Sequence, residues 1–185
     1  MKPLVSSYLF LGGVSVASVV ADQATKMMAV KKLDTPSAPP IVRVVDHLNL
    51  ALAHNKGGAG SFLSTTPDSF RMPFFLGVST VAIVAMVIFY RRVLPGQWAL
   101  RWGLPLMLGG AIGNLIDRVR FGHVIDFLQV YARIGGITRY WPTFNVADIA
   151  ISVGVALLGI DLIQQMRGSF RTPHAPPASD PGASA

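Results

Sequence analysis

The stretch MPFFLGVSTVAIVAMVIFY, residues 72–90, contains no charged residue and is followed directly by Arg91 and Arg92. A helix of about 20 apolar residues is long enough to cross the hydrocarbon core of a bilayer. A basic pair at the end of such a run is typical of a membrane boundary. The stretch therefore predicts a membrane-spanning helix and sets the class of the whole chain.

Three further runs are almost free of charge: residues 3–21, 95–116 and 141–166. Each is long enough to span, and Pro142 suits the first turn of the last one. Gly109 and Gly113 would give the third run a small-residue face for close helix packing. We predict a mainly α membrane protein with four transmembrane helices.

The first run has an alternative explanation, because it follows Lys2 and ends in the small residues Val19 to Ala21. That pattern also fits a cleavable signal peptide. The run is longer than the apolar core of most signal peptides, and residues 22–26 continue its helical pattern. We therefore favour a retained span.

The composition agrees with a membrane protein, since 51% of residues are hydrophobic and 14% are charged, against about 25% charged in soluble domains. The net charge of +7 comes from basic residues at the ends of apolar runs. This placement favours contact with anionic lipid head groups and no nucleic-acid partner. The chain has no cysteine, which excludes disulfides, thiolate metal sites and a cysteine nucleophile.

The connections between the runs differ in character. After a Pro-rich piece, residues 41–45 and the alternating Leu48, Leu50 and Leu52 predict strands in a β-rich loop at about residues 38–66. Residues 119–140 predict an amphipathic interfacial helix. Residues 1–168 read as one domain, and the polar tail 169–185 is expected to be disordered. Counting basic residues in the loops leaves the orientation in the membrane open.

Carboxylates and amides remain as candidates for chemistry, because the sequence lacks the zinc-protease and serine-hydrolase motifs. Asn114 and Asp117 are three residues apart, as are Asn145 and Asp148, so each pair would share a helix face. Asp22 and Lys26 are at ion-pair spacing. The histidines show no metal-ligand spacing.

Each of these residues also has a simpler structural explanation. They are a salt bridge for Asp22 and Lys26, an ion pair or interface anchor for Asp117 and Arg118, a helix cap for Asn145, a buried hydrogen-bonded group for Asp148, a solvated face for Asp126, and a plain interfacial charge for Asp161. Taken together, however, all of them except Asp161 fall at one end of the predicted spans. A proton or cation relay would instead need ionisable groups at several depths of the membrane.

Four motifs in order resemble the lipoprotein signal peptidase (signal peptidase II) family of bacterial inner-membrane aspartic peptidases. They are Asp22 to Lys26, Asn55 to Phe62, Gly113 to Arg118 with Gly122 to Phe127, and Phe144 to Asp148. The resemblance covers about residues 10–165. It implies a peptidase that removes signal peptides from diacylglyceryl-modified prolipoproteins.

The resemblance also implies a set of site residues. The catalytic pair maps onto Asp126 and Asp148. The supporting positions map onto Asp22, Lys26, Asn55, Gly57, Asn114, Asp117, Arg118, Asn145 and Ala147. It further implies a small extracytoplasmic β-cradle, an active site at the periplasmic face, cytoplasmic termini, and no metal or other cofactor. We expect a monomer in contact with membrane lipids.

The sequence departs from the family pattern at Gly58 and Gly60, where the family commonly has an alanine and a large aromatic residue. Glycine adds backbone freedom, so we expect a looser loop there. Two carboxyl groups that share a site hold one proton between them near neutral pH. The hypothesis is that one aspartate activates water while the other donates a proton, and the sequence leaves open which is which.

Overall fold

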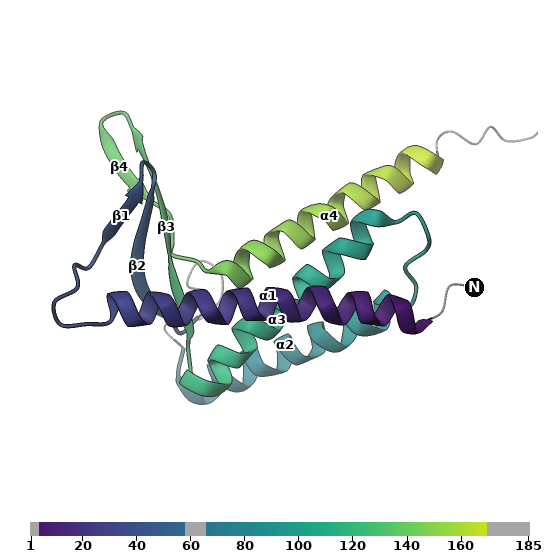
Figure 1. Cartoon of the computed structure of the whole chain (residues 1–185), viewed down its shortest axis with the longest axis horizontal. Coiled ribbons are helices and arrows are strands. Elements are labelled where there is room, and N and C mark those ends of the chain that lie inside the picture. The colour runs from purple at the N-terminus through teal and green to yellow at the C-terminus, as the bar shows by residue number, and fades with distance from the viewer. Residues whose placement is uncertain (1–3, 58–65, 170–185) are drawn as a thin grey trace, which may run out of the picture.

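The computed structural model describes residues 4–57 and 66–169 of the chain, which form four helices and a small sheet (Figure 1). The helices are α1 (Leu4–Leu33), α2 (Asp68–Tyr90), α3 (Trp98–Phe121) and α4 (Val146–Ser169). The strands are β1 (Val42–Val45), β2 (Leu48–Asn55), β3 (Val124–Ile134) and β4 (Ile137–Tyr140). Gly58, Gly60 and residues 170–185 of the tail, on which the sequence made predictions, lie outside the described residues, whereas Ser169 is the last residue of α4.

Helix α3 is the centre of the helical part, because it packs against each of the other three helices. The close packing predicted for its glycines is confirmed. A Cβ atom added at Gly109 would lie 2.7 Å from the backbone oxygen of Ser15 on α1, and one added at Gly113 would lie 2.6 Å from Oδ2 of Asp22. Glycine at these two positions therefore lets α1 and α3 approach each other closely.

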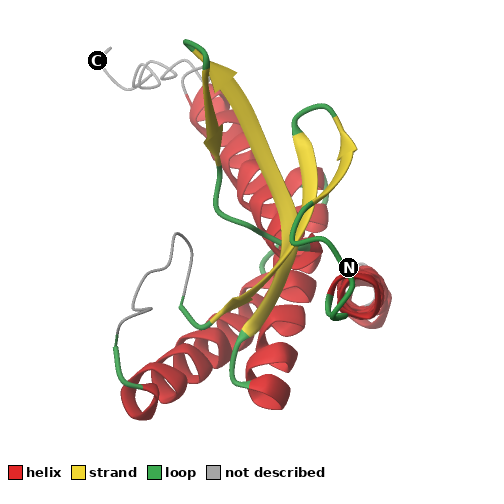
Figure 2. Ribbon diagram, turned by 90° about the vertical axis from the view of Figure 1, so that its left-hand side faces the viewer, coloured by secondary structure: helices red, strands yellow, loops and turns green. Residues whose placement is uncertain are grey.

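The sheet is antiparallel in the order β1-β2-β3-β4 and projects from one end of the helices (Figures 1 and 2). The strands predicted around residues 41–52 are confirmed as β1 and β2. The start of α1, the end of α4 and the α2–α3 turn lie at the opposite end from the sheet (Figure 1). The C-terminal end of α3 and the N-terminal end of α4 are consequently next to the strands.

Two helices of the described part, α2 and residues 146–167 of α4, are long and apolar enough to cross a membrane. This finding agrees with a membrane protein of mainly helical structure. Helix α1 continues to Leu33, as expected from the helical pattern of residues 22–26.

The interfacial helix predicted within residues 119–140 is wrong. Helix α3 ends at Phe121, and β3 and β4 then form a hairpin across Gly135 and Gly136, whose φ angles are +59° and +79°. A two-residue turn with positive φ at both positions joins strands with the correct twist, and glycine adopts it without strain. The Gly-Gly pair is therefore the local sequence signal for a hairpin, and the amphipathic pattern of the segment is misleading.

The predicted start of the last helix is also wrong, because α4 begins at Val146 and Pro142 precedes it. Residues 141–145 are not helical, and the backbone N–H of Phe144 donates to the carbonyl of Leu128 on β3. This extended segment brings Asn145 to the edge of the sheet.

Asp161 of α4 is not a plain interfacial charge, since it is buried. Its carboxylate accepts hydrogen bonds from the side chains of Gln97 and Gln165. Burial of a carboxylate is costly unless hydrogen-bond donors replace its water, and here two amides do so.

Candidate active site

Asp126 lies on β3 opposite Ala53 of β2, and only 1% of its surface is exposed. Two amide groups from separate elements donate to its carboxylate. Nδ2 of Asn55 lies 3.0 Å from Oδ2, and Nδ2 of Asn145 lies 2.7 Å from Oδ1. The sheet therefore carries Asp126, and neutral amides fix the position of its two oxygens.

Asp148 is held by a reciprocal cap at the start of α4. Oδ1 of Asn145 accepts from the backbone N–H of Asp148 at 3.0 Å, and Oδ2 of Asp148 accepts from the backbone N–H of Asn145 at 3.2 Å. This pairing at i and i+3 is a capping box, which satisfies two orphan donors at a helix start. The cap predicted for Asn145 is confirmed, and the same side chain also reaches Asp126.

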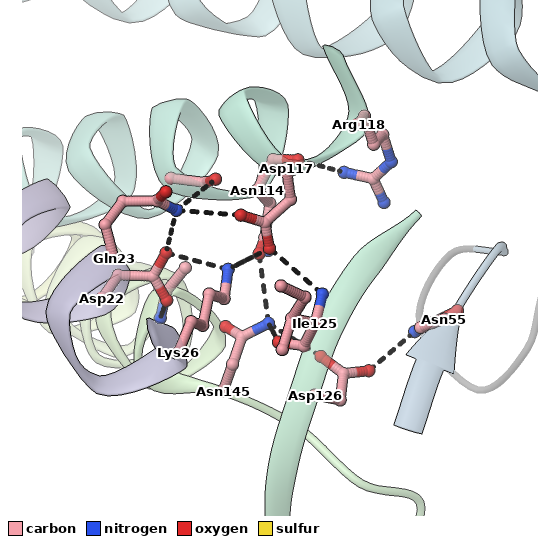
Figure 3. Close-up of polar contacts among 12 residues, drawn as sticks. Asp22, Gln23, Lys26, Asn55, Asn114, Asp117, Arg118, Ile125, Asp126 and Asn145 are labelled. Carbon is pink, nitrogen blue, oxygen red and sulfur yellow. Dashed lines mark hydrogen bonds and ion pairs between the residues drawn. The ribbon is translucent and has the colours of Figure 1, made fainter. Parts of the chain in front are cut away.

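A second group of charges, which we call the buried triad, consists of Asp22, Lys26 and Asp117 (Figure 3). Their exposures are 0%, 2% and 1%. Nζ of Lys26 lies 2.8 Å from Oδ2 of Asp22 and 2.7 Å from Oδ2 of Asp117. The expected ion pair between Asp22 and Lys26 is confirmed, but it is part of a triad that joins α1 to α3.

The triad also holds the backbone immediately before each candidate catalytic residue. Oδ1 of Asp22 accepts from the backbone N–H of Ala147 at 2.9 Å, and Oδ2 of Asp117 accepts from that of Ile125 at 3.1 Å. Ala147 precedes Asp148, and Ile125 precedes Asp126. Two structural carboxylates thus set the positions of the two candidate catalytic carboxylates.

Asn114 lies between the triad and the pair. Its Oδ1 is 3.1 Å from Nζ of Lys26, and its Nδ2 is 2.9 Å from Oδ1 of Asp148. Arg118, one turn further along α3, donates to the carbonyl oxygens of Gly57 and Asn114 at 3.4 and 3.3 Å, and its guanidinium lies over the ring of Phe75.

Every site residue predicted from the sequence therefore belongs to one connected network. The catalytic and supporting roles of these residues stay predictions. Gln23 belongs to it too and was missed. Its side-chain amide donates to Oδ1 of Asp117 at 2.9 Å and also reaches Asp22 and the carbonyl of Gly113. Only its position beside Asp22 hinted at this role, because no spacing pattern links Gln23 to α3.

A cavity of about 950 Å³ opens beside the network. Asp126, Asp148, Asn114 and Arg118 contribute to its wall. The remainder of the wall includes apolar side chains of three helices: Phe75, Val78, Ala82 and Met86 of α2, Met107 and Ala111 of α3, and Ile151 of α4. The cavity thus joins a polar end with two carboxylates to an apolar cleft between helices.

Burial dominates the electrostatics of Asp126. It raises the pKa of this carboxyl from 3.8 to about 6, and the nearby charge of Asp148 acts in the same direction. Hydrogen bonds from Asn55 and Asn145 and the charge of Lys26 oppose the rise. A carboxyl group with such a pKa can carry a proton under mildly acidic conditions and give it up near neutrality.

Two histidines meet beside this strand, since the ring centres of His54 and His123 are 4.5 Å apart. Burial and the charge of His54 lower the pKa of His123, so His123 is neutral near pH 7. Sequence spacing gave no hint of this proximity, because the two residues belong to different elements of the sheet region.

Comparisons with known proteins agree on one family. A family model described as signal peptidase (SPase) II matches residues 14–164. The chain belongs to the signal peptidase II family. It is 44% identical over 167 residues to the lipoprotein signal peptidase of Geobacter metallireducens, covering 90% of this chain and 96% of that protein. It is 41% identical over 150 residues to that of Cupriavidus pinatubonensis, covering 80% of each.

The fold has solved counterparts as well. A structure described as a bacterial membrane enzyme superposes with a TM-score of 0.71 at 26% identity, covering 93% of this chain and 96% of the other. A second one, described in the same way, gives 0.67 at 29% identity over 87% and 94%. The resemblance stated from the motifs is therefore confirmed, and the chain is a peptidase of a membrane-enzyme family.

Proposed function

We propose that this signal peptidase II removes signal peptides from diacylglyceryl-modified prolipoproteins, with Asp126 and Asp148 as its catalytic pair. The observation that carries the proposal is the meeting of these two carboxylates at one cavity. They come from a strand and a helix, and both accept a hydrogen bond from Asn145, Asp126 from its side-chain amide and Asp148 from its backbone N–H; both border an apolar cleft. Family membership and the relatives' name, lipoprotein signal peptidase, support the same reaction.

The reaction needs one ionised and one protonated carboxyl group. The ionised member takes a proton from a water molecule, whose oxygen attacks the scissile carbonyl carbon. The protonated member donates to the carbonyl oxygen as the tetrahedral intermediate forms. When the intermediate collapses, the C–N bond breaks and the proton taken from water passes to the leaving amine. The hydroxyl formed from the carbonyl oxygen returns its proton to the other aspartate, so the carboxyl pair regains its starting state.

The apolar part of the cavity supports a lipidated substrate. Side chains of α2, α3 and α4 line it, and the outer surfaces of α2 and α4 carry exposed aliphatic residues such as Val81 and Leu162. The diacylglyceryl chains of the substrate would lie against α2 and α4, with the scissile bond at Asp126 and Asp148.

The same geometry supports a proposed arrangement in the membrane. We infer four transmembrane helices with the sheet outside the membrane as an extracytoplasmic β-cradle. The active site would face the periplasm, and both termini would be cytoplasmic. The ends of α1 and α4 that lie opposite the sheet support this orientation (Figure 1). Residues 1–168 would form the peptidase domain of a monomer in the bacterial inner membrane, with residues 169–185 as a cytoplasmic tail.

The proton or cation relay remains the alternative, and the distribution of charges argues against it. Residues 102–116 and 149–160 contain no ionisable side chain. Asp161 is thus separated from the network by a long apolar stretch of α4. A relay needs intermediate groups at several depths, and the sequence of these two helices provides none.

The test is cleavage of a diacylglyceryl-modified prolipoprotein peptide by the purified protein in detergent, with and without a chelator. We expect cleavage by the wild type that a chelator does not reduce, and none by Asp126→Asn or Asp148→Asn. Asp46→Asn is the matched control, because Asp46 is exposed in the turn between β1 and β2 and does not line the cavity. Near-normal cleavage by either folded active-site variant, or none by folded wild type, would refute the proposal.

A further inference from the structure

The ammonium group of Lys26 has three oxygen atoms around it, one for each of its hydrogens. It contacts Oδ2 of Asp22, Oδ2 of Asp117 and Oδ1 of Asn114 at 2.8, 2.7 and 3.1 Å. A lysine ammonium has three hydrogens to donate and no lone pair to accept with. The atom of Asn114 that faces Lys26 must therefore be its oxygen.

A second contact fixes the Asn114 amide in the same orientation. Oδ1 of Asn145 accepts the backbone N–H of Asp148, so Nδ2 of Asn145 is the donor that lies 3.1 Å from Oδ1 of Asn114. With its oxygen held by two donors, the NH₂ group of Asn114 is directed at Oδ1 of Asp148, 2.9 Å away. An NH₂ group is only a donor, so it favours an acceptor at that place.

We propose that Lys26 is a positioning residue for the reaction: through Asn114 it keeps Asp148 in the ionised, water-activating form and leaves the resting proton on Asp126. This inference rests on the proposed function. It assigns the base and the acid within the pair, which the catalytic scheme alone leaves interchangeable.

The surroundings of the two carboxyl groups favour a charge on Asp148 and a proton on Asp126. Asp148 is half-buried, lies in the first turn of α4 and accepts the backbone N–H of Asn145. The positive end of the helix dipole favours a negative charge there. Asp126 is more deeply buried and lies on a strand. The hydrogen bonds to both carboxylates come from neutral N–H groups, so the difference between them lies in burial and in the helix start.

The charged neighbours of Asp126 act on it in opposite directions. The charge of Asp148 on α4 raises the pKa of Asp126, and that of Lys26 on α1 lowers it. Burial is the largest influence, and the net result is a pKa of about 6. The balance of these groups agrees with a proton on Asp126 at the start of the cycle below about pH 6.

The reaction then has a defined proton path. The Asp148 carboxylate takes a proton from water while the water oxygen attacks the carbonyl carbon, and Asp126 gives its proton to the carbonyl oxygen. On collapse, the C–N bond breaks and the proton on Asp148 passes to the amine. The hydroxyl that originated as the carbonyl oxygen returns its proton to Asp126.

The first test is Asn114→Asp, which keeps the size of the side chain and its acceptor for Lys26 and Asn145 but replaces the donor to Asp148 with a negative charge. We expect kcat to fall about 10²-fold or more, as for loss of acid–base function, with KM little changed. The acid limb of the pH–kcat profile should shift to higher pH, which lost packing alone would not cause. Asn49→Asp is the matched control, being a buried asparagine on β2 that bonds Gln129.

The second test acts on Lys26 and includes a direct measurement. Lys26→Met/Asp117→Asn removes one positive and one negative charge together, so the net charge of the triad is unchanged and one buried carboxylate, Asp22, remains in place of two. The double variant should lower kcat and shift the acid limb of the pH–kcat profile to higher pH, as Asn114→Asp does. Every acidic residue of the chain is an aspartate, so ¹³Cγ-aspartate labelling reports all carboxyl groups by NMR. The signal lost in Asp126→Asn should be that of a protonated carboxyl below about pH 6 in the wild type.

The outcomes separate this inference from the proposed function. If the wild type cleaves and Asn114→Asp cleaves as fast with an unshifted profile, the positioning role is refuted while the peptidase stands. An ionised Asp126 at pH 5 in the NMR titration would reverse the assignment of acid and base. Failure of folded wild type to cleave would instead refute the proposed function.

Discussion

The molecule contains two pairs of carboxylates in one polar network, and they differ in what surrounds them. Asp22 and Asp117 share the ammonium of Lys26, and each also accepts a backbone N–H group. Asp126 and Asp148 are bonded by amide side chains and line a cavity. The first pair shares one buried cation and is closed off from the cavity, whereas the second is near space that a substrate and water can occupy.

This difference separates structural carboxylates from reactive ones. A carboxylate that shares a buried ammonium is held in place by that charge. One held by neutral amides beside a cavity can exchange a proton at low cost. The first pair also fixes the backbone before each member of the second, so the closed pair serves to orient the open one.

The largest expected effect concerns the open pair. Asp126→Asn and Asp148→Asn should each reduce kcat/KM by about 10³-fold or more, roughly 4 kcal/mol of barrier, while the unfolding midpoint does not fall. Peptide cleavage and thermal unfolding in the same detergent measure both quantities. A variant that loses cleavage only because it unfolds would erase the distinction between the pairs.

The closed pair should lose stability when its cation is removed, which the open pair should not do when either of its members is replaced. Lys26→Met leaves two buried carboxylates without a counter-charge, and breaking such a pair costs about 3–5 kcal/mol. Chemical denaturation of the detergent-solubilised protein measures the loss. Lys31→Met is the matched control, because Lys31 is exposed on the same helix. A loss no greater than that of the control would mean that the triad adds little stability.

The sequence predicted that these carboxylates gather at one end of the helices, because apolar runs alternate in direction, and the family resemblance pointed to Asp126 and Asp148 as a pair. It also predicted β1 and β2 from their alternation. What it could not supply was register across the sheet. Asn55 meets Asp126 only because Ala53 pairs with Asp126 across β2 and β3, and such long-range pairing leaves no local periodicity.

The errors have the same origin. The segment 119–140 has an amphipathic pattern, but most of it forms strands because Gly135 and Gly136 make a tight turn and because β3 pairs with β2. Helix α4 starts at Val146 because the preceding residues pair with β3 through Phe144. Asp161 is buried because Gln97, which precedes α3, and Gln165 reach it. Each outcome depends on a neighbour distant in the sequence or in a different element.

The dependence of stability on pH should also reveal the raised pKa of Asp126, a member of the open pair. The pKa of Asp126 is raised from 3.8 to about 6 in the folded state. Between these values the folded protein binds more protons than the unfolded chain, so its free energy of unfolding decreases as pH rises, by up to about 3 kcal/mol at 1.36 kcal/mol per unit.

Asp126→Asn should lack this decrease and therefore be more stable than the wild type above pH 6. Unfolding free energies of both proteins between pH 4 and pH 7 provide the measurement. Asp46→Asn, on the exposed part of the sheet, should keep the wild-type pH dependence. Parallel curves for Asp126→Asn and wild type would show that Asp126 is ionised as easily as in the unfolded chain.

Gly113 tests whether the closed pair orients the open one, because it is where α3 passes Asp22. A Cβ atom at Gly113 would lie 2.6 Å from Oδ2 of Asp22, so Gly113→Ala must displace that carboxylate at a cost of about 1–3 kcal/mol. Gly77→Ala on α2 is the control. Nothing lies within 4 Å of its added Cβ, and alanine there should stabilise the helix by about 0.5–1 kcal/mol.

Displacement of Asp22 also loosens its bond to Ala147, so Gly113→Ala should lower kcat, whereas Gly77→Ala should not. Destabilisation with unchanged kcat would mean that the capping box alone is sufficient to hold Asp148 in place.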